Sequence, residues 1–401
     1  MRSVVANKLE IFLVALRLGL TSFGGPAAHL GYFRDEYVVK RQWISEKDYT
    51  EIIALCQFLP GPASSQVGIA VGMNRGGIIG GFLAWLGFTL PSAMILGAFA
   101  YGILTFEDVG SLGWFKGLKI VAVPVVGVAI YGMFGRFCID WPRRGIAIIA
   151  TSVVLVIGIA NSQVYVIICA GLLGLVIPLP AVQITSEEKK PVVIGYIIPT
   201  ISLVVFGVIL FIFSNPAITQ LFDNEYFSLA ENFYRVGSLV FGGGHVVLPL
   251  LHDTTVVTGW VTEDQFVAGY GLAQAIPGPL FTFAAYLGVL IDQPLGPWVG
   301  GMVAIVAIFL PSFFLVAGVL PFWNRVRDVK MMQRSVSGVN AAVVGLLIAA
   351  FYNPIWTSTI HKPEDLLLCG FSLGAMVVLK WPTWLVVMLT AGLGQGMTYF
   401  I

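Results

Sequence analysis

The sequence predicts an all-α integral membrane protein made of two related halves. Three observations support this prediction: an apolar composition, recurring apolar runs, and motifs of the first half that return in the second. Hydrophobic residues make up 57% of the 401 residues, charged residues only 11%, and the mean hydropathy is +0.89. A soluble domain carries about 25% charged residues. The composition therefore excludes a disordered chain, a nucleic-acid-binding protein and an ordinary soluble enzyme, and makes membrane lipid the first expected partner.

Apolar runs divide the chain into thirteen candidate segments, most of them near the ~20 residues that a spanning helix needs. Met1–Lys8 leads into the first run without an Ala-x-Ala cleavage site, so we interpret this run as a membrane segment rather than a removable signal peptide. The segments are 9–33, 50–74, 77–104, 114–135, 145–160, 164–180, 192–214, 227–251, 265–290, 297–322, 333–352, 364–380 and 383–400.

Polar linkers separate these segments into six, one connector and six more. The linker Gln183–Lys190 precedes the lone apolar segment 192–214, and acidic residues follow that segment. We therefore predict a first repeat over 1–181, a linker and connector helix over 182–220, and a second repeat over 221–401.

The two groups of six segments share motifs in the same order. The shift between matched residues stays between 217 and 220, and chance does not explain an ordered set, so we infer an internal duplication. The matched pairs are RLGLTSFGGP from Arg17 with RVGSLVFGGG from Arg235, WISEKDY from Trp43 with WVTEDQF from Trp260, QFLPGP from Gln57 with QAIPGP from Gln274, and LPS from Leu90 with LPS from Leu310.

Basic residues in short loops predict the orientation of the halves, because such loops favour the cytoplasm. Loops 136–144, 181–191 and 323–334 are basic, whereas loop 105–111 is acidic and is expected outside. Loop 323–334 aligns with loop 105–111, so the halves are predicted to be inverted, with a cytoplasmic N-terminus and an outside C-terminus. Inverted repeats are typical of secondary transporters, whose site lies near the midplane between the repeats.

The first two segments of each half contain Gly/Pro motifs that should interrupt a helix at membrane depth. Such backbone is tolerated only where it is buried in protein or lines a wet cavity. Each break can start a half-helix whose free N–H groups and positive dipole end attract an anion, with Pro26, Pro62 and Pro279 suited to the first turn. The motifs are FGGP at 23–26, LPGP at 59–62, FGGG at 241–244 and IPGP at 276–279.

Charges between the broken segments favour re-entrant hairpins over full crossing. Residues 34–47 contain four Lys or Arg, whereas the counterpart 252–264 contains none and has three carboxylates. Hairpins with tips at the breaks account for this, and full crossing gives the same orientation elsewhere, so both interpretations stay open. Ser45 with Asp48, and Thr262 with Gln265, resemble capping boxes that open the second broken segment of each half.

Polar residues around the breaks are the candidate substrate ligands. An intramembrane arginine is costly and its planar fork suits oxyanions, although Arg17 and Arg235 could instead snorkel or pair with Glu10 or Glu231. The glutamines could instead tie the broken backbone, and Ser64 could cap a half-helix. The predicted substrate-binding residues are Arg17, Gly24, Gly25, Gln57, Gly61, Ser64, Ser65, Arg235, Gly242, Gly243, Gln274, Gly278 and Thr282.

Four titratable residues are candidates for proton coupling: His29, Asp35, His245 and Asp253. Histidine changes its charge near neutral pH, although a lone histidine is more often structural, and Asp35 could simply pair with Arg34. The four cysteines are scattered singly, so the sequence predicts no metal site, cofactor or disulfide framework.

The ordered motifs resemble those of the chromate ion transporter family in its two-domain, long-chain form. The resemblance covers essentially the whole chain and is carried by FGGP-x-x-H at 23–29, W-(I/V)-(S/T)-E at 43–46 and 260–263, Q-x-x-PGP at 57–62 and 274–279, and FGGGHVVLP at 241–249. It implies a bacterial or archaeal inner-membrane protein that exports chromate and confers resistance, and a link to sulfate, which has the same tetrahedral dianion shape.

The residues alone predict a secondary transporter of an oxyanion. The sequence contains no GxxxxGK[ST] motif, which would bind ATP for active transport. An inside-negative potential favours export of a dianion by about 2.3 kcal/mol per charge per 100 mV. An importer or channel for sulfate or another oxyanion is the alternative within transport. An intramembrane enzyme is the alternative of another class, but neither HExxH nor GxSxG occurs, so no enzyme is expected. A homodimer is left open.

Overall fold

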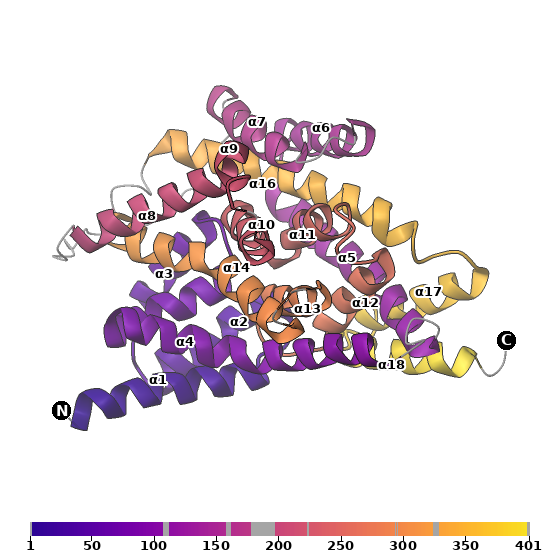
Figure 1. The fold of residues 1–401 in the computed structure, drawn as a ribbon, viewed down its shortest axis with the longest axis horizontal. Coiled ribbons are helices and arrows are strands. Elements are labelled where there is room, and N and C mark those ends of the chain that lie inside the picture. The colour runs from indigo at the N-terminus through magenta and orange to yellow at the C-terminus, as the bar shows by residue number, and fades with distance from the viewer. Residues whose placement is uncertain are drawn as a thin grey trace.

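A computed structural model shows a helical protein, with some helices along its longest axis and others across it (Figure 1). It describes residues 2–106, 112–157, 162–177, 197–222, 224–292, 294, 296–323 and 329–398. The predicted linker Gln183–Lys190 and most of the charged loop residues used to orient the halves lie outside this described part. The start of α1 and the end of α18 lie toward opposite ends of the molecule (Figure 1).

The first half contains seven α-helices and one π-helical turn within the described residues. In chain order they are α1 (Arg2–Thr21), α2 (Gly25–Phe33), η1 (Arg34–Lys40), α3 (Glu46–Phe58), α4 (Ala63–Thr105), α5 (Gly113–Phe137), α6 (Trp141–Ile157) and α7 (Ser162–Val176). The connector follows as α8 (Ile197–Ser214) and the short α9 (Pro216–Thr219).

The second half repeats this order with shorter pieces. Its elements are α10 (Glu225–Leu239), η3 (Gly244–Val246), α11 (Val247–Thr255), α12 (Glu263–Ala273), η4 (Leu280–Thr282), α13 (Phe283–Leu290), α14 (Pro297–Val319), η5 (Leu320–Phe322), α16 (Lys330–Ala350), η6 (Phe351–Trp356), α17 (Pro363–Val377) and α18 (Thr383–Met397).

Five helical stretches in the described part are long and apolar enough to cross a membrane. They are Ala63–Thr105, Gly113–Phe137, Ile197–Ser214, Pro297–Phe322 and Lys330–Trp356. The runs predicted at 145–160 and 164–180 form α6 and α7, which have 17 and 15 residues and so fall short of the ~20 expected.

Helices are interrupted at all four Gly/Pro motifs. α1 ends at Thr21 and α3 at Phe58, while α10 ends at Leu239 and α12 at Ala273. Pro26 lies in the first turn of α2, as expected. Pro62 and Pro279 instead stand one residue before the next helical turn, in extended backbone, because each follows a glycine with positive φ that first redirects the chain.

Both predicted caps are present. The Ser45 hydroxyl accepts a hydrogen bond from the Asp48 N–H (3.1 Å), so α3 begins at Glu46. The Thr262 hydroxyl accepts from the Gln265 N–H (3.3 Å), and the Gln265 side chain accepts from the Thr262 N–H (3.1 Å), which completes a capping box.

A tight reversal follows the second break of each half. In α4 the helix turns back at Gly76 and Gly77, where Gly77 has φ +64°, and a Cβ on Gly72 would lie 2.5 Å from the Gly80 carbonyl oxygen. In the second half, a Cβ on Gly288 of α13 would likewise lie 2.5 Å from the Gly300 carbonyl oxygen of α14. Glycines therefore let two antiparallel helices touch in the same way in both halves.

Charged side chains show that the first half returns twice to the same end of the molecule. Glu10, in the first half of α1, accepts hydrogen bonds from Arg41, just after η1 (2.9 Å), and from Arg75, at the end of the first arm of α4 (3.2 Å). The breaks at 22–24 and 59–62 lie between these meeting points along the chain. α1–α2 and α3–α4 therefore form two hairpins with their ends together, and we name them the first-half hairpins.

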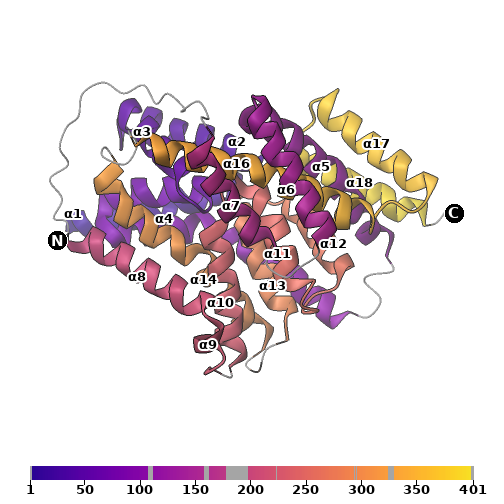
Figure 2. The ribbon, with the colours of Figure 1, turned by 90° about the horizontal axis from the view of Figure 1, so that it is seen from above.

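The two halves are interlocked through their last helices. α6 and α7 pack against α16, whereas α17 and α18 pack against α5 (Figure 2). One hydrophobic cluster also draws on residues of both halves, with Trp85 of α4 making edge contacts to Phe309 and Phe313 of α14. The breaks consequently lie in a shared interior rather than in two separate domains.

Candidate functional site

The four breaks meet through reciprocal backbone hydrogen bonds between the halves. The Gly61 N–H donates to the Val240 carbonyl (2.6 Å), and the Gly278 N–H donates to the Ser22 carbonyl (3.0 Å). Val240 and Ser22 immediately precede the two FGG motifs. Each PGP break therefore satisfies a helix-end carbonyl that the FGG break of the other half leaves free.

A second reciprocal contact explains why glycine stands in both PGP motifs. Gly61 and Gly278 have φ of +118° and +109°. A Cβ on Gly61 would lie 2.6 Å from the Ser312 hydroxyl oxygen, and a Cβ on Gly278 would lie 2.7 Å from that of Ser92. Ser92 and Ser312 lie midway along the second arm of α4 and along α14, so the breaks cross at mid-length of these long helices.

The FGG motifs border open space at the same junction. Gly24, Gly25, Gly242 and Gly243 all have positive φ, and a Cβ on Gly25 or Gly243 would meet no atom within 4 Å. The Pro26 ring lies 3.3 Å from where a Gly244 Cβ would be, so the starts of α2 and η3 face each other. Backbone that begins two half-helices is therefore accessible from this space.

Several buried polar atoms around the breaks lack a hydrogen-bond partner among the described residues. They include the hydroxyls of Ser22 and Ser65 and the Gln274 side-chain nitrogen. By contrast, the Thr282 hydroxyl donates to the Pro279 carbonyl (2.7 Å). Buried donors without a partner cost free energy unless something accepts from them, and donors are the groups that an anion requires.

Gln66 stands between the first PGP break and the other half. Its side-chain nitrogen donates to the Pro60 carbonyl (2.6 Å) and to the Ser312 hydroxyl (3.2 Å). Gln66 therefore ties the broken backbone, the alternative role predicted for Gln57 and Gln274.

Two histidines lie at the breaks, in different surroundings. His29 Nδ1 is 3.4 Å from the Ser64 hydroxyl, and its Nε2 has no partner within the described structure. His245 Nδ1 is 2.7 Å from the hydroxyl of buried Tyr270. Ser64 thus faces His29 and forms no cap hydrogen bond for α4.

The two arginines predicted from the repeat lie on α1 and α10, the helices that precede the FGG breaks. Arg17 is exposed, and its guanidinium makes no hydrogen bond to a described residue, although it acts electrostatically on Glu36. Arg235 lies near Glu231 (3.5 Å) and donates to Asn232 (3.2 Å) on its own helix. The structural alternative of a carboxylate partner therefore holds for Arg235.

The predicted carboxylates lie toward the ends of the hairpin arms. Asp35 is exposed in η1, and Arg34 pairs with Glu46 (2.7 Å) rather than with Asp35. Asp253 lies in the last turns of α11.

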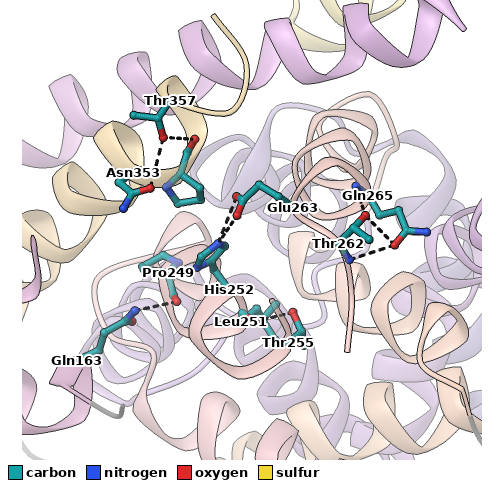
Figure 3. A network of polar contacts seen from close by, with 11 residues as sticks. Gln163, Pro249, Leu251, His252, Thr255, Thr262, Glu263, Gln265, Asn353 and Thr357 are labelled. Atoms are coloured by element: carbon teal, nitrogen blue, oxygen red, sulfur yellow. Dashed lines mark hydrogen bonds and ion pairs between the residues drawn. The ribbon is translucent and has the colours of Figure 1, made fainter. Parts of the chain in front are cut away.

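The ends of the hairpins differ between the halves. In the first half, Arg41 also donates to Glu36 (2.7 Å), and Arg75 lies over the Trp43 ring (4.5 Å). Burial would raise the pKa of Glu36, but the hydrogen bond and charge of Arg41 outweigh it and hold that pKa below its usual value. In the second half, His252 and Glu263 join α11 to α12 (3.2 Å), as Figure 3 shows.

Arg136, which the sequence assigned to the basic loop 136–144 expected in the cytoplasm, lies at the end of α5 beside the first PGP break. Arg136, near the end of α5, donates from Nη2 to the Gln57 side-chain oxygen (2.8 Å), and Gln57 lies two residues before the break begins. Ser92 and Ser312 belong to the repeated LPS motif, which the sequence analysis used as evidence for the duplication and not as part of the site. The contact of Arg136 carries no local sequence signal, because α5 is far from Gln57 along the chain.

Comparison with known proteins identifies related sequences over nearly the whole chain. Residues 9–175 and 227–395 match the family described as Chromate transporter. A chromate transport protein of Pseudomonas aeruginosa is 28% identical over 407 residues, covering 97% of this chain and 92% of that protein. One of Cupriavidus metallidurans is 27% identical, covering 89% and 85%.

A shorter relative matches only part of the chain. An uncharacterized transporter of Bacillus subtilis is 31% identical over 161 residues, which cover 39% of this chain but 88% of that protein. No solved structure matches the chain.

Proposed function

The chain belongs to the chromate transporter family, and from this premise we propose that it is a secondary transporter that exports chromate across the cytoplasmic membrane and so confers chromate resistance. The family and the long apolar helices establish a multi-pass membrane protein of transport function. Outward transport, location in the cytoplasmic membrane and an anion-binding site at the breaks are the parts that we propose.

The reciprocal junction of the four breaks carries the proposal. The first turns of the half-helices, whose N–H groups have no partner within the helix, add to the unpartnered side-chain donors of Ser22, Ser65 and Gln274. Together with the open space beside Gly25 and Gly243, they form a donor-rich surface. A tetrahedral dianion accepts several hydrogen bonds and is stabilised by positive helix ends. Gly24, Gly61, Gly242, Gly278 and the neighbouring Ser64 and Thr282 shape that surface.

The ion pairs of Glu10 support re-entrant hairpins. Because Glu10 meets both Arg41 and Arg75, the outer ends of the first-half hairpins lie together, and their tips are the breaks. We place these ends at the cytoplasmic face and the breaks near the midplane, where Ser92 and Ser312 divide the long helices. An inverted second half would then place its own hairpin ends outside.

Energy for export comes from the membrane potential, with protons as a second source. An inside-negative potential drives a dianion outward. His29 and His245 are the proton-coupling candidates nearest the breaks, whereas Asp35 and Asp253 would act only near the hairpin ends. Arg17 and Arg235 would attract the anion from about one and a half turns away rather than hold it.

Transport into inside-out membrane vesicles tests the function. Labelled chromate and labelled sulfate are supplied separately, with the vesicle interior positive and with or without a pH gradient. Export predicts accumulation of chromate in vesicles that contain the protein and none in vesicles from cells that lack it. Accumulation of sulfate alone, or uptake only into right-side-out vesicles, would instead favour the importer or channel.

A further inference from the structure

Arg136 lies between the breaks of the two halves. Its guanidinium donates to Gln57 beside the first PGP break and stands 5.3 Å from the ring of its neighbour Phe137. That ring lies 3.5 Å from where a Cβ on Gly242, in the second FGG break, would be. A residue of α5 thus places a positive charge where the two halves meet.

The charge of Arg136 has no carboxylate partner in the described part of the chain. Arg34, Arg41, Arg75, Arg143 and Arg235 each lie within 4.0 Å of a carboxylate. Arg136 instead donates one N–H to the neutral amide of Gln57. Its side chain is exposed, so its other N–H groups are available to a ligand. Guanidinium is the side chain best suited to hold an oxyanion through parallel hydrogen bonds.

The counterpart of Arg136 in the second half is neutral. Gly117 packs on Thr390 of α18 and Gly338 packs on Ala170 of α7, so α5 corresponds to α16 with a shift close to that of the other motifs. At this shift Arg136 falls at residues 353–357, which are Asn-Pro-Ile-Trp-Thr. Asn353 and Thr357 there bond to each other (3.3 Å; Figure 3) and bring no positive charge.

We propose that the Arg136 guanidinium binds the transported oxyanion at the junction of the breaks. This inference rests on the proposed function. It assigns the recognition of the dianion to α5 of the first half, so that one side of the junction is positive and the equivalent side is not.

Initial rates of chromate and sulfate uptake into inside-out vesicles provide the test, with KM and Vmax measured separately. Arg136→Gln is expected to raise KM roughly tenfold or more, since a charge-assisted contact is lost. Arg136→Lys keeps the charge without the planar fork, so about a threefold rise is expected. Arg144→Gln removes a charge from the same stretch, where Arg144 bonds the Cys138 carbonyl, and should leave KM within about twofold.

A second variant neutralises Arg136 without replacing it. Gln57→Glu sets a carboxylate against the guanidinium, and it should raise KM as Arg136→Gln does even if the latter folds poorly. Unchanged KM in Arg136→Gln and Gln57→Glu, a loss confined to Vmax, or an equal rise in Arg144→Gln would each overturn the inference. A wild-type protein that moves no oxyanion would overturn the proposed function itself, which is a distinguishable result.

Discussion

Backbone contacts at the breaks are repeated in both halves, whereas the charged contacts at the hairpin ends differ between the halves. At the breaks, two contacts are the same in both halves: the N–H groups of Gly61 and Gly278 bond to Val240 and Ser22, and each glycine faces a serine of the other half. At the hairpin ends, the first half carries the Glu10, Arg41 and Arg75 network, whereas the second half carries a His252 and Glu263 pair.

This difference has a physical cause. Each break satisfies backbone groups of the other half, so a change in one motif requires a matching change in its partner. The ends are held by side-chain ion pairs, some within one half and some between the halves, such as Lys119 of α5 with Asp264 of α12 (2.5 Å), and in the proposed topology they face different compartments. They are therefore free to differ in charge, whereas the breaks are not.

The largest effect on transport is expected when the paired glycines are replaced by alanine. Gly61→Ala and Gly278→Ala place a Cβ 2.6–2.7 Å from a serine hydroxyl at positive φ, and left-handed backbone alone costs about 1–2 kcal/mol. We expect both variants to lose vesicle uptake. Gly31→Ala is the control, because a Cβ there meets no atom within 4 Å. If only one of the two paired variants lost uptake, the breaks would not be equivalent.

Cysteine labelling should sharpen the contrast between the ends. The control Cys169→Ser removes the exposed native thiol, and the other cysteines are buried. Added to this background, Thr258→Cys should react with a membrane-impermeant maleimide in intact cells, and Lys40→Cys only after permeabilisation. Reaction from the opposite sides would show that the broken segments cross the membrane.

Neutralising Glu10 should affect stability more than transport. Glu10→Gln weakens contacts to both Arg41 and Arg75, which are partly exposed, so a loss of about 1 kcal/mol in unfolding free energy is expected. His252→Gln at the other end should cost less. Thermal unfolding in detergent measures both, and a loss of uptake in Glu10→Gln without destabilisation would contradict a purely structural role for the end.

The smallest effect is expected from pH at the same end. Arg41 holds the pKa of Glu36 below its ordinary value of 4.5, so its ion pair stabilises the fold above that pH and is lost as pH falls through the lower folded value. The melting temperature of wild type should exceed that of Glu36→Gln by about 2 °C at pH 7. The gap should close as the pH falls through the lowered pKa of Glu36. A gap that widened on acidification would contradict this assignment.

Local patterns predicted much of this molecule. The interruptions at 22–24 and 59–62, and the caps at Ser45 and Thr262, depend on the dihedral preferences and hydrogen bonding of adjacent residues. The site residues stay a prediction. The glycines, serines and glutamines named from the motifs lie at the breaks, whereas the neighbours of Arg17 and Arg235 could not be predicted, because spacing along one helix does not tell which neighbour a side chain meets.

The sequence by itself determined a membrane protein of two related halves with four broken helices, because composition and Gly/Pro chemistry act locally and recur with the duplication. Only the tertiary structure decided which break bonds to which, that α5 carries Arg136 to Gln57, and that α6 and α7 pack on α16. These contacts join residues far apart in the chain. The bonds between the breaks satisfy backbone groups that each half leaves open in the other, whereas the remaining two depend on how the helices pack.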